Sequence, residues 1–244
     1  MKLSGEEIER YNRQIKMKVW GLEGQLKIKR AKALVAGVGG LGCSIALALV
    51  SIGFGKVVLV DYERVELSNL SRQVLYSTRD IGKLKVRVAA ERLRELNPSV
   101  EIEALSERIT EENAVDLVKG VDLVLDGQDN FESRYALNRA CISLGVPFIH
   151  GAVYGVEGRV MTVLPRKTAC LRCLHPVAPE AKEIVPVTIP TVSITASIQV
   201  MEAIKLVIGF GDLIVNKVLI IDLESNSFDY IPVERKRDCI DCGG

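Results

Sequence analysis

The chain has 244 residues, of which 48% are hydrophobic and 26% charged, and its formal net charge is +1. This length allows one large domain or two small ones with a substantial core. The near-neutral charge argues against a protein that coats nucleic acid or an acidic membrane. The N-terminus is charged, and apolar runs such as ALALVSIGFG are too short to cross a bilayer. We therefore expect a cytoplasmic protein with neither a nucleic acid nor a membrane as partner.

Helices and strands alternate in the first 146 residues. In chain order we predict helices at 5–16 and 22–30, a strand at 32–37, a helix at 41–53, a strand at 56–61, a helix at 82–96, strands at 100–105 and 121–126, and a helix at 130–145. Strands that alternate with helices form parallel sheets through right-handed crossovers. This half of the chain predicts an α/β fold with a Rossmann-like, doubly wound sheet.

The pattern changes in residues 147–244. Strands are predicted at 147–155, 157–165, 217–224 and 227–233, with short links or one helix between them. Hairpins of this kind extend the sheet in antiparallel fashion. Residues 175–190 hold four of the eight prolines and cannot form regular structure. We expect a functional loop there, over 174–190.

A glycine-rich turn, VAGVGGLG at 35–42, joins the first predicted strand to a helix. Gly37, Gly39 and Gly42 fit the pattern G-x-G-x-x-G, and Gly40 lies within it. Such a turn lets the backbone approach phosphate groups. Asp61 ends the next strand, where a carboxylate can accept hydrogen bonds from a ribose. These residues alone fit an NAD site, a site for other phosphates, or a tight turn with no ligand.

Polar and cationic residues follow Asp61 closely. Asn69, Arg72 and Gln73 lie in NLSRQ, and Lys85 lies near the start of the next helix. A triphosphate needs several charge-assisted donors, whereas a redox domain has no need for them at this place. Lys85 taken alone also fits a solvated helix charge. The set favours a triphosphate over NAD.

Asp129 and Asn130 come just after the strand VDLVLD. In a doubly wound sheet the carboxyl end of that strand faces the ligand crevice. An exposed carboxylate there suits Mg²⁺, which binds one or two carboxylates together with phosphate oxygens. The alternative is that the pair caps the following helix.

Six cysteines fall into two groups. Two Cys-x-x-Cys pairs, made of Cys170, Cys173, Cys239 and Cys242, offer the four thiolates of a structural zinc site. The alternative is two labile disulfides or free thiols. Cys43 and Cys141 lie in apolar helical stretches, and we expect them in the core.

Taken together, the motifs resemble the MoeB/ThiF (HesA/MoeB/ThiF) adenylyltransferases, relatives of ubiquitin-activating enzyme. The matching stretches are RYNRQI at 10–15, GVGGLG, the run from Asp61 to Gln73, GKLKV, LDGQDN with Arg134 and Asn138, and the two cysteine pairs. The resemblance covers almost the whole chain. It implies a single ThiF-type domain over 1–244, with a nucleotide-binding half at 1–146. The half at 147–244 would bind the carrier, hold the Cys₄ zinc site and contain the crossover loop 174–190.

The resemblance also implies a reaction. ATP and Mg²⁺ would activate the C-terminal glycine of a ubiquitin-like sulfur carrier ending in Gly-Gly, giving an acyl-adenylate and pyrophosphate. Asp61 would hold the ribose, Arg72 and Lys85 the phosphates, and Asp129 the magnesium. Arg13 would reach the triphosphate from the other subunit of a homodimer. Catalytic roles thus fall to Arg13, Arg72, Lys85 and Asp129.

One feature departs from many relatives, which carry a cysteine in the crossover loop. Residues 174–190 contain none, and so we predict no covalent intermediate on this chain. Neither His150 nor His175 is placed as an obvious base. Alternative interpretations are a relative that adenylates a small molecule or a tRNA base, an NAD-dependent dehydrogenase, and a non-catalytic binding module with the same fold. The complete cationic set argues against the last two.

Overall fold

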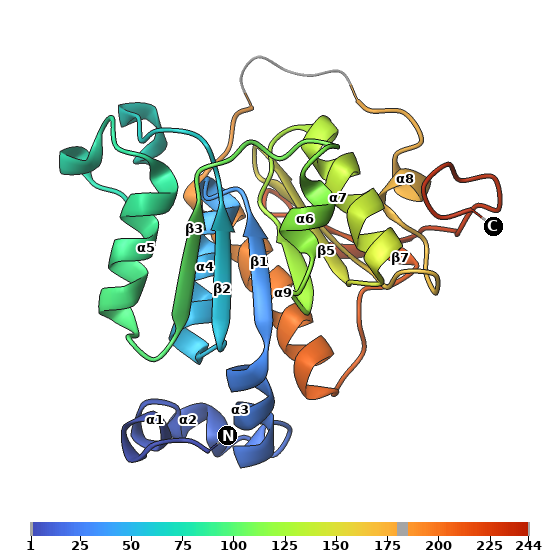
Figure 1. Cartoon of the computed structure of the whole chain (residues 1–244). Coiled ribbons are helices and arrows are strands. Elements are labelled where there is room, and N and C mark those ends of the chain that lie inside the picture. Colours follow the sequence, from blue (N-terminus) through green and yellow to red (C-terminus); the bar gives the residue numbers. More distant parts are fainter. Residues whose placement is uncertain (1, 180–184, 244) are drawn as a thin grey trace.

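The computed structural model describes residues 2–179 and 185–243. Its centre is one eight-stranded sheet in the order β3-β2-β1-β4-β5-β6-β7-β8 (Figure 1). The strands are β1 Lys32–Ala36, β2 Lys56–Val60, β3 Glu101–Leu105, β4 Leu123–Asp126, β5 Phe148–Tyr154, β6 Glu157–Val163, β7 Lys217–Asp222 and β8 Ser227–Pro232. The first five are parallel, and β5 to β8 pair antiparallel. The predicted sheet is confirmed.

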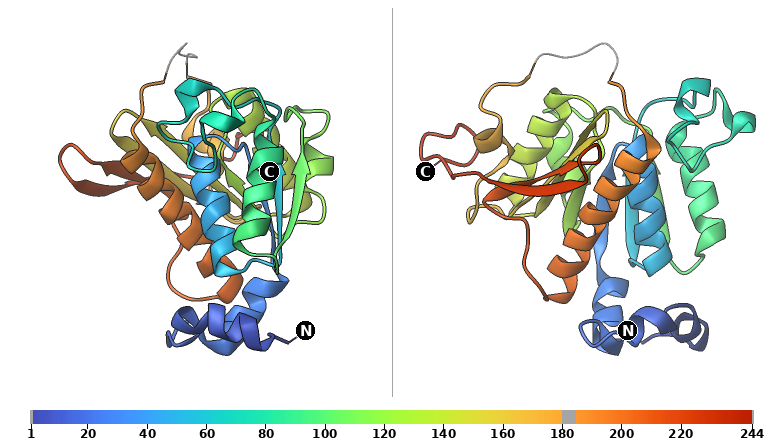
Figure 2. Two further views of the ribbon diagram at one scale, coloured as in Figure 1. Left: turned by 90° about the vertical axis from the view of Figure 1, so that its left-hand side faces the viewer. Right: turned by 180° about the vertical axis from the view of Figure 1, so that it is seen from behind.

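Helices cover both faces of the sheet. They are α1 Gly5–Arg10, α2 Asn12–Ile15, α3 Gly21–Arg30, α4 Gly40–Ile52, α5 Lys85–Leu96, α6 Ala114–Val118, α7 Phe131–Leu144, α8 Leu171–Leu174 and α9 Ile189–Ile208. One apolar cluster joins the sheet to α3, α4, α5 and α9, and a second joins the opposite face to α6, α7 and α8. Seen from behind, α9 runs alongside α4 (Figure 2).

The central strand β1 shows why short apolar runs became buried strands. Ala33 and Val35 enter one core cluster, whereas Leu34 and Ala36 enter the other. Successive side chains of a strand point to opposite faces. A strand with helices on both faces is therefore apolar throughout instead of alternating.

The predicted helix at 5–16 is wrong in one respect, because it is two helices that meet at Tyr11. The Tyr11 ring is buried and lies against Gly53, where a Cβ would come within 2.4 Å of the ring. Its hydroxyl accepts a hydrogen bond from Asn97 Nδ2 at 2.9 Å. Burying this ring at the far end of α4 turns the chain. The predicted helix at 82–96 also begins later, at Lys85, because Leu84 is extended.

Helix α9 has the length and composition of a membrane-spanning segment, but 56% of its apolar window is buried inside the protein. It packs on β5, β6 and α4, and so it is a helix of the protein core. The predicted loop 174–190 is shorter at both ends, since Leu174 ends α8 and Ile189 begins α9. Residues 180–184 of that prediction lie outside the described residues.

Candidate nucleotide site and cysteine cluster

The strand order changes direction between β1 and β4. The chain passes from β1 to β2 and β3 on one side, and then returns to place β4 on the other side of β1. The loops that follow β1 and β4 leave the same edge of the sheet toward opposite faces, since α4 and α7 belong to different core clusters. Ligands of doubly wound folds bind at this switch point, outside the carboxyl ends of the strands.

The glycine turn follows β1 and opens α4. Gly37 has φ +85°, which favours glycine, and a Cβ on Gly42 would lie 1.8 Å from the Gly37 carbonyl oxygen. Gly39 is the N-cap of α4, and no side chain within 2–179 and 185–243 caps the helix there. The N-terminus of a helix with free N–H groups attracts phosphate. The predicted strand–turn–helix arrangement is confirmed.

Asp61 ties this turn to the end of β2. Its Oδ2 accepts a hydrogen bond from Val38 N at 2.8 Å, and its Oδ1 accepts one from Glu63 N at 2.8 Å. Burial raises the pKa of the Asp61 carboxyl, although these backbone hydrogen bonds oppose the shift. Each carboxylate oxygen has more than one acceptor site. Asp61 can therefore hold the turn and still accept from a ribose hydroxyl.

Arg72 and Gln73 lie over the start of α4. A Cβ placed on Gly40 would be 3.7 Å from Arg72 Cγ, and one placed on Gly39 would be 3.8 Å from Gln73 Nε2. The Arg72 guanidinium donates to Ser68 O at 3.0 Å. The buried Gln73 side chain has an Oε1 atom with no hydrogen-bond partner among the described residues. The structure thus brings both side chains to the glycine turn.

Asn69 has a structural task in the same segment. Its Oδ1 accepts from Glu66 N at 3.1 Å, which closes the short 3₁₀ helix Leu67–Asn69. The residue is buried. This hydrogen bond shapes the segment that presents Arg72.

Lys85 begins α5 and is almost fully buried, with 3% of its side chain exposed. Its ammonium group forms an ion pair with Glu63 Oε2. Sequence reasoning gave Glu63 no role, although it lies only two residues after Asp61. An ammonium group has three donors, so the pair with Glu63 leaves Lys85 able to donate to a phosphate as well.

Asp129 and Asn130 lie in the loop between β4 and α7. The Asp129 side chain is exposed and accepts a hydrogen bond from Asn130 Nδ2 at 3.3 Å. Asn130 caps α7, because its Oδ1 accepts from Ser133 N at 2.9 Å. The capping alternative thus describes Asn130, while Asp129 is free to meet a cation. Gln128 of this loop lies against Gly37.

A buried polar network lies under this loop, and sequence reasoning missed it. Asp126 Oδ2 accepts from Arg134 Nε at 3.1 Å and lies 2.7 Å from His150 Nδ1. Arg134 belonged to the matched motif without a stated role, and His150 had none. Burial lowers the pKa of His150, against the opposing effect of Asp126. An ionised carboxylate only accepts hydrogen bonds, so the ring donates its Nδ1–H to Asp126.

Arg13 lies at the other end of the molecule. It is exposed on α2. The next residue, Gln14, donates a hydrogen bond to Ile52 O at the end of α4, at 2.8 Å. The glycine turn lies at the beginning of α4, and 13 helical residues span about 20 Å. Figure 1 shows the N-terminal helices below the sheet, away from the carboxyl ends of β1 and β4. Within one chain, Arg13 does not join the site.

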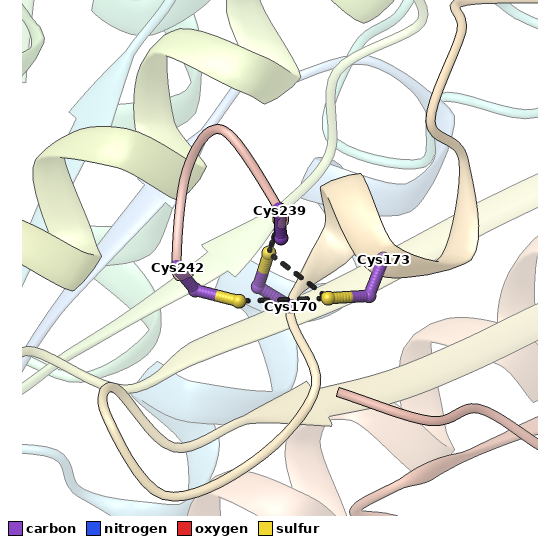
Figure 3. A group of neighbouring side chains, drawn as sticks. All are labelled: Cys170, Cys173, Cys239 and Cys242. Carbon is purple, nitrogen blue, oxygen red and sulfur yellow. Dashed lines mark hydrogen bonds between the residues drawn. The ribbon is translucent and has the colours of Figure 1, made fainter. Parts of the chain in front are cut away.

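The four cysteines of the two Cys-x-x-Cys pairs meet in one cluster (Figure 3). The sulfur of Cys170 lies 3.9 Å from that of Cys173 and 3.7 Å from that of Cys239. The sulfurs of Cys173 and Cys242 are 3.5 Å apart. Four sulfurs bound to zinc at about 2.3 Å form a tetrahedron with edges of about 3.8 Å. The cluster fits zinc, and the separations are too long for disulfides.

Polar side chains fix this cluster to the rest of the fold. Asp241 is buried and accepts from Asn138 Nδ2 at 2.8 Å. Asn138 Oδ1 in turn accepts from Leu171 N at 3.1 Å. The two cysteine pairs are thus joined through α7 as well as through the thiols. Cys43 and Cys141 are fully buried, as predicted, and burial raises the pKa of Cys43 to about 12.

Fold and site together define a class: an α/β nucleotide-binding enzyme with an open phosphate site and a separate, closed thiolate cluster. The ThiF family model matches residues 11–242, and the chain belongs to the ThiF family. It is 38% identical to a sulfur carrier protein adenylyltransferase of Thermus thermophilus, over 100% of this chain and 93% of that protein. It is 37% identical to a SAMP-activating enzyme E1 of Haloferax volcanii, over 100% and 92%.

Solved structures agree with this assignment. E. coli MccB crystallised with MccA-N7isoASN has a TM-score of 0.87 and 25% identity, over 96% of this chain and 75% of that chain. Longer curated relatives also match. The alignment with an adenylyltransferase and sulfurtransferase MOCS3 of Culex quinquefasciatus covers 99% of this chain but only 56% of that protein, at 35% identity. The protein is thus an enzyme of the adenylyltransferase class that uses ATP.

Proposed function

We propose that the protein adenylates the C-terminal glycine of a small ubiquitin-like sulfur-carrier protein in the cytoplasm, with Mg²⁺ as a cofactor. The observation that carries this proposal is the set of groups gathered around the glycine turn. Arg72 lies against Gly40, and Gln128 of the Asp129 loop lies against Gly37. Lys85 is paired with Glu63, whose backbone N–H donates to Asp61. The names of the two full-length relatives supply the substrate class.

The chemistry needs few proton transfers. A terminal carboxyl group has a pKa of about 3.5, so the attacking carboxylate is already ionised at neutral pH. It bonds to the α-phosphorus of ATP, and the bond to pyrophosphate breaks. Rate enhancement then depends on in-line placement and on neutralising charge on the phosphates. His150 and His175 are not needed as bases.

Each residue has a specific part in this proposal. Asp61 accepts from the ribose, the start of α4 and Gln73 approach the phosphates, and Arg72 and Lys85 neutralise their charge. Asp129 would hold Mg²⁺, and the ion would supply positive charge close to the phosphates. Asn69 and Asn130 act on neighbouring backbone, and they would shape the nucleotide site instead of supplying charge.

The carrier tail would approach between the two halves of the chain. Residues 185–188 return toward the site, where Gly155 N donates to Pro186 O at 2.6 Å. Helix α9 then starts beside the glycine turn, since a Cβ on Gly40 would be 3.4 Å from Val192. We infer that residues 1–146 bind ATP and residues 147–244 receive the carrier, within one ThiF-type domain.

The position of Arg13 supports a homodimer. Its own site is about 20 Å away, whereas a two-fold axis would place it at the partner's site and repeat that contact. The N-terminal helices and their links also carry exposed apolar side chains close to Arg13 in the sequence, namely Ile8, Met17, Val19 and Leu22. We propose that this surface packs on a second copy of the chain.

ATP–pyrophosphate exchange tests the function. Candidate Gly-Gly carriers from the same organism are each added to the enzyme with ATP, Mg²⁺ and labelled pyrophosphate. We expect label to enter ATP with a matching carrier, and not with the same carrier lacking its last glycine. An exchange rate that does not change when the last glycine is deleted would refute the carrier as substrate. Exchange supported by a small carboxylic acid instead would favour the small-molecule alternative.

A further inference from the structure

The buried network beneath the Asp129 loop has a member without an assigned task, His150. Asp126 is the last residue of β4 and is fully buried. Three groups satisfy its carboxylate: Arg134 and His150 at Oδ2, and Gln128 N at Oδ1, 2.9 Å away. A buried carboxylate is costly without such partners. Its orientation is therefore set by all three.

The same network holds the loop that carries Asp129. Gly127 N donates to Ala36 O at 2.8 Å, and Arg134 Nη2 donates to Gln128 O at 2.6 Å. A Cβ on Gly37 would lie 2.8 Å from Gly127 O. The loop is thus pressed against the glycine turn, and its backbone is bonded on both sides. Asp129 is the next residue after this fixed segment, and it is exposed to solvent.

His150 lies where it can influence the position of this loop. It is on β5, beside β4, and both the Nδ1 contact of His150 and the Nε contact of Arg134 reach the same Asp126 oxygen. Arg134 also donates to Gly151 O at 3.1 Å, so its position does not depend on Asp126 alone. If the histidine donor is lost, Oδ2 keeps only the longer contact, and the carboxylate can rotate away from Gln128 N.

We propose that His150 is a positioning residue which, through Asp126, fixes the loop 127–130 and so sets the affinity of Asp129 for the divalent cation of the ATP complex. The proposal rests on the proposed function for the role of Asp129. His150 contacts neither nucleotide nor metal in this account. Partners that hold a metal ligand in place typically change metal affinity by about 10- to 100-fold.

Two substitutions separate hydrogen bonding from packing. His150→Asn keeps an N–H donor near the position of Nδ1, whereas His150→Leu keeps a similar volume without a donor. Met161 faces His150 in the β5–β6 register and is fully buried. Met161→Leu is therefore a matched control for repacking at the same place in the sheet.

The first measurement needs no ligand. Amide hydrogen exchange of residues 127–130 is compared between the four proteins. We expect faster exchange at Gln128 in His150→Leu, and near-normal exchange in His150→Asn and Met161→Leu. The second measurement is Mn²⁺ binding in the presence of a non-hydrolysable ATP analogue, followed by electron paramagnetic resonance. His150→Leu should bind Mn²⁺ about 10-fold more weakly, with most of the affinity restored in His150→Asn.

Unchanged exchange and unchanged Mn²⁺ affinity in His150→Leu would overturn the proposal. So would a fall in melting temperature with no change in metal affinity, because that pattern indicates a purely structural histidine. Failure of the proposed function looks different. In that case the unsubstituted protein itself shows no nucleotide-dependent Mn²⁺ binding, while the exchange measurement still reports whether His150 holds the loop.

Discussion

The sheet edge that carries the glycine turn and Asp129, here called the nucleotide edge, and the cysteine cluster are both built from loops at the margins of one sheet. They differ in how completely their polar groups are paired within the protein. In the cluster the four thiols face one another at the distances of a tetrahedron, and Asp241 and Asn138 are paired with their surroundings. At the nucleotide edge Asp129 is exposed, and the start of α4 receives no side-chain cap from the described part of the chain. Structural metal sites are closed, whereas sites that act on a substrate keep open positions. The comparison assigns stability to one region and chemistry to the other.

Metal removal should have the largest effect on stability. The purified protein should hold about one zinc per chain, and chelation should cost roughly 4 kcal/mol, a drop in Tm of about 8–16 °C for a chain of this size. Cys239→Ser should behave in the same way. Metal analysis with thermal unfolding checks this. A zinc-free protein with full stability would show that the cluster does not serve as a metal site.

Substitutions at the nucleotide edge should instead lower activity and leave stability almost unchanged. Arg72→Ala and Asp129→Ala should each slow ATP–pyrophosphate exchange by about 100-fold or more, because a lost charge contact in the transition state costs about 3 kcal/mol. Both side chains are at least partly exposed, so Tm should move little. Asp116→Ala, at an exposed carboxylate on α6, is the control for removing a charge. Large losses of stability in the first two variants would remove the distinction between the regions.

Subunit mixing gives an effect of intermediate size. Arg13→Ala and Asp129→Ala homodimers should both be inactive. Co-expression makes half the dimers mixed, and each mixed dimer gathers both defects in one site, so about a quarter of all sites should work. If activity does not return, Arg13 does not act across the interface. If Arg13→Ala is active alone, the residue has no part in catalysis.

The smallest effect is expected at the two core thiols. Cys43→Ala and Cys141→Ala should leave the exchange rate within about twofold and cost about 1 kcal/mol in stability, as small core truncations do. Intact mass spectrometry should detect no adduct between carrier and enzyme that is sensitive to dithiothreitol. Trapping such an adduct on either cysteine would contradict the prediction that this chain forms no covalent intermediate.

Local patterns in the sequence predicted those parts of the site that follow one strand or one spacing. The glycine turn and Asp61 each come directly after an apolar run, and Asp129 comes just after one. The cysteine pairs show their chemistry in their spacing alone. The Asp126–His150 contact was not predictable in this way. The two residues are adjacent only because β4 and β5 pair in parallel, with Val124 opposite Phe148. A carboxylate that ends the buried run VDLVLD was nevertheless a signal that a partner was needed.

The break at Tyr11 shows the same limit on a smaller scale. The periodicity of residues 5–16 is that of one helix, and only the burial of the Tyr11 ring against Gly53 and Asn97 decides otherwise. Tertiary contacts override local propensity in such cases. Arg13 follows this break, and so its distance from the glycine turn became visible only in the structure.

The central claim is that this chain transfers AMP to a carrier's terminal glycine, and intact mass spectrometry of the carrier tests it most directly. A matching Gly-Gly carrier is incubated with the enzyme, ATP, Mg²⁺ and pyrophosphatase, which removes the product that drives reversal. We predict that the carrier gains the mass of one adenylate, and that the carrier without its last glycine gains nothing. No adduct on any intact Gly-Gly carrier, or the same adduct on the truncated one, would contradict the account.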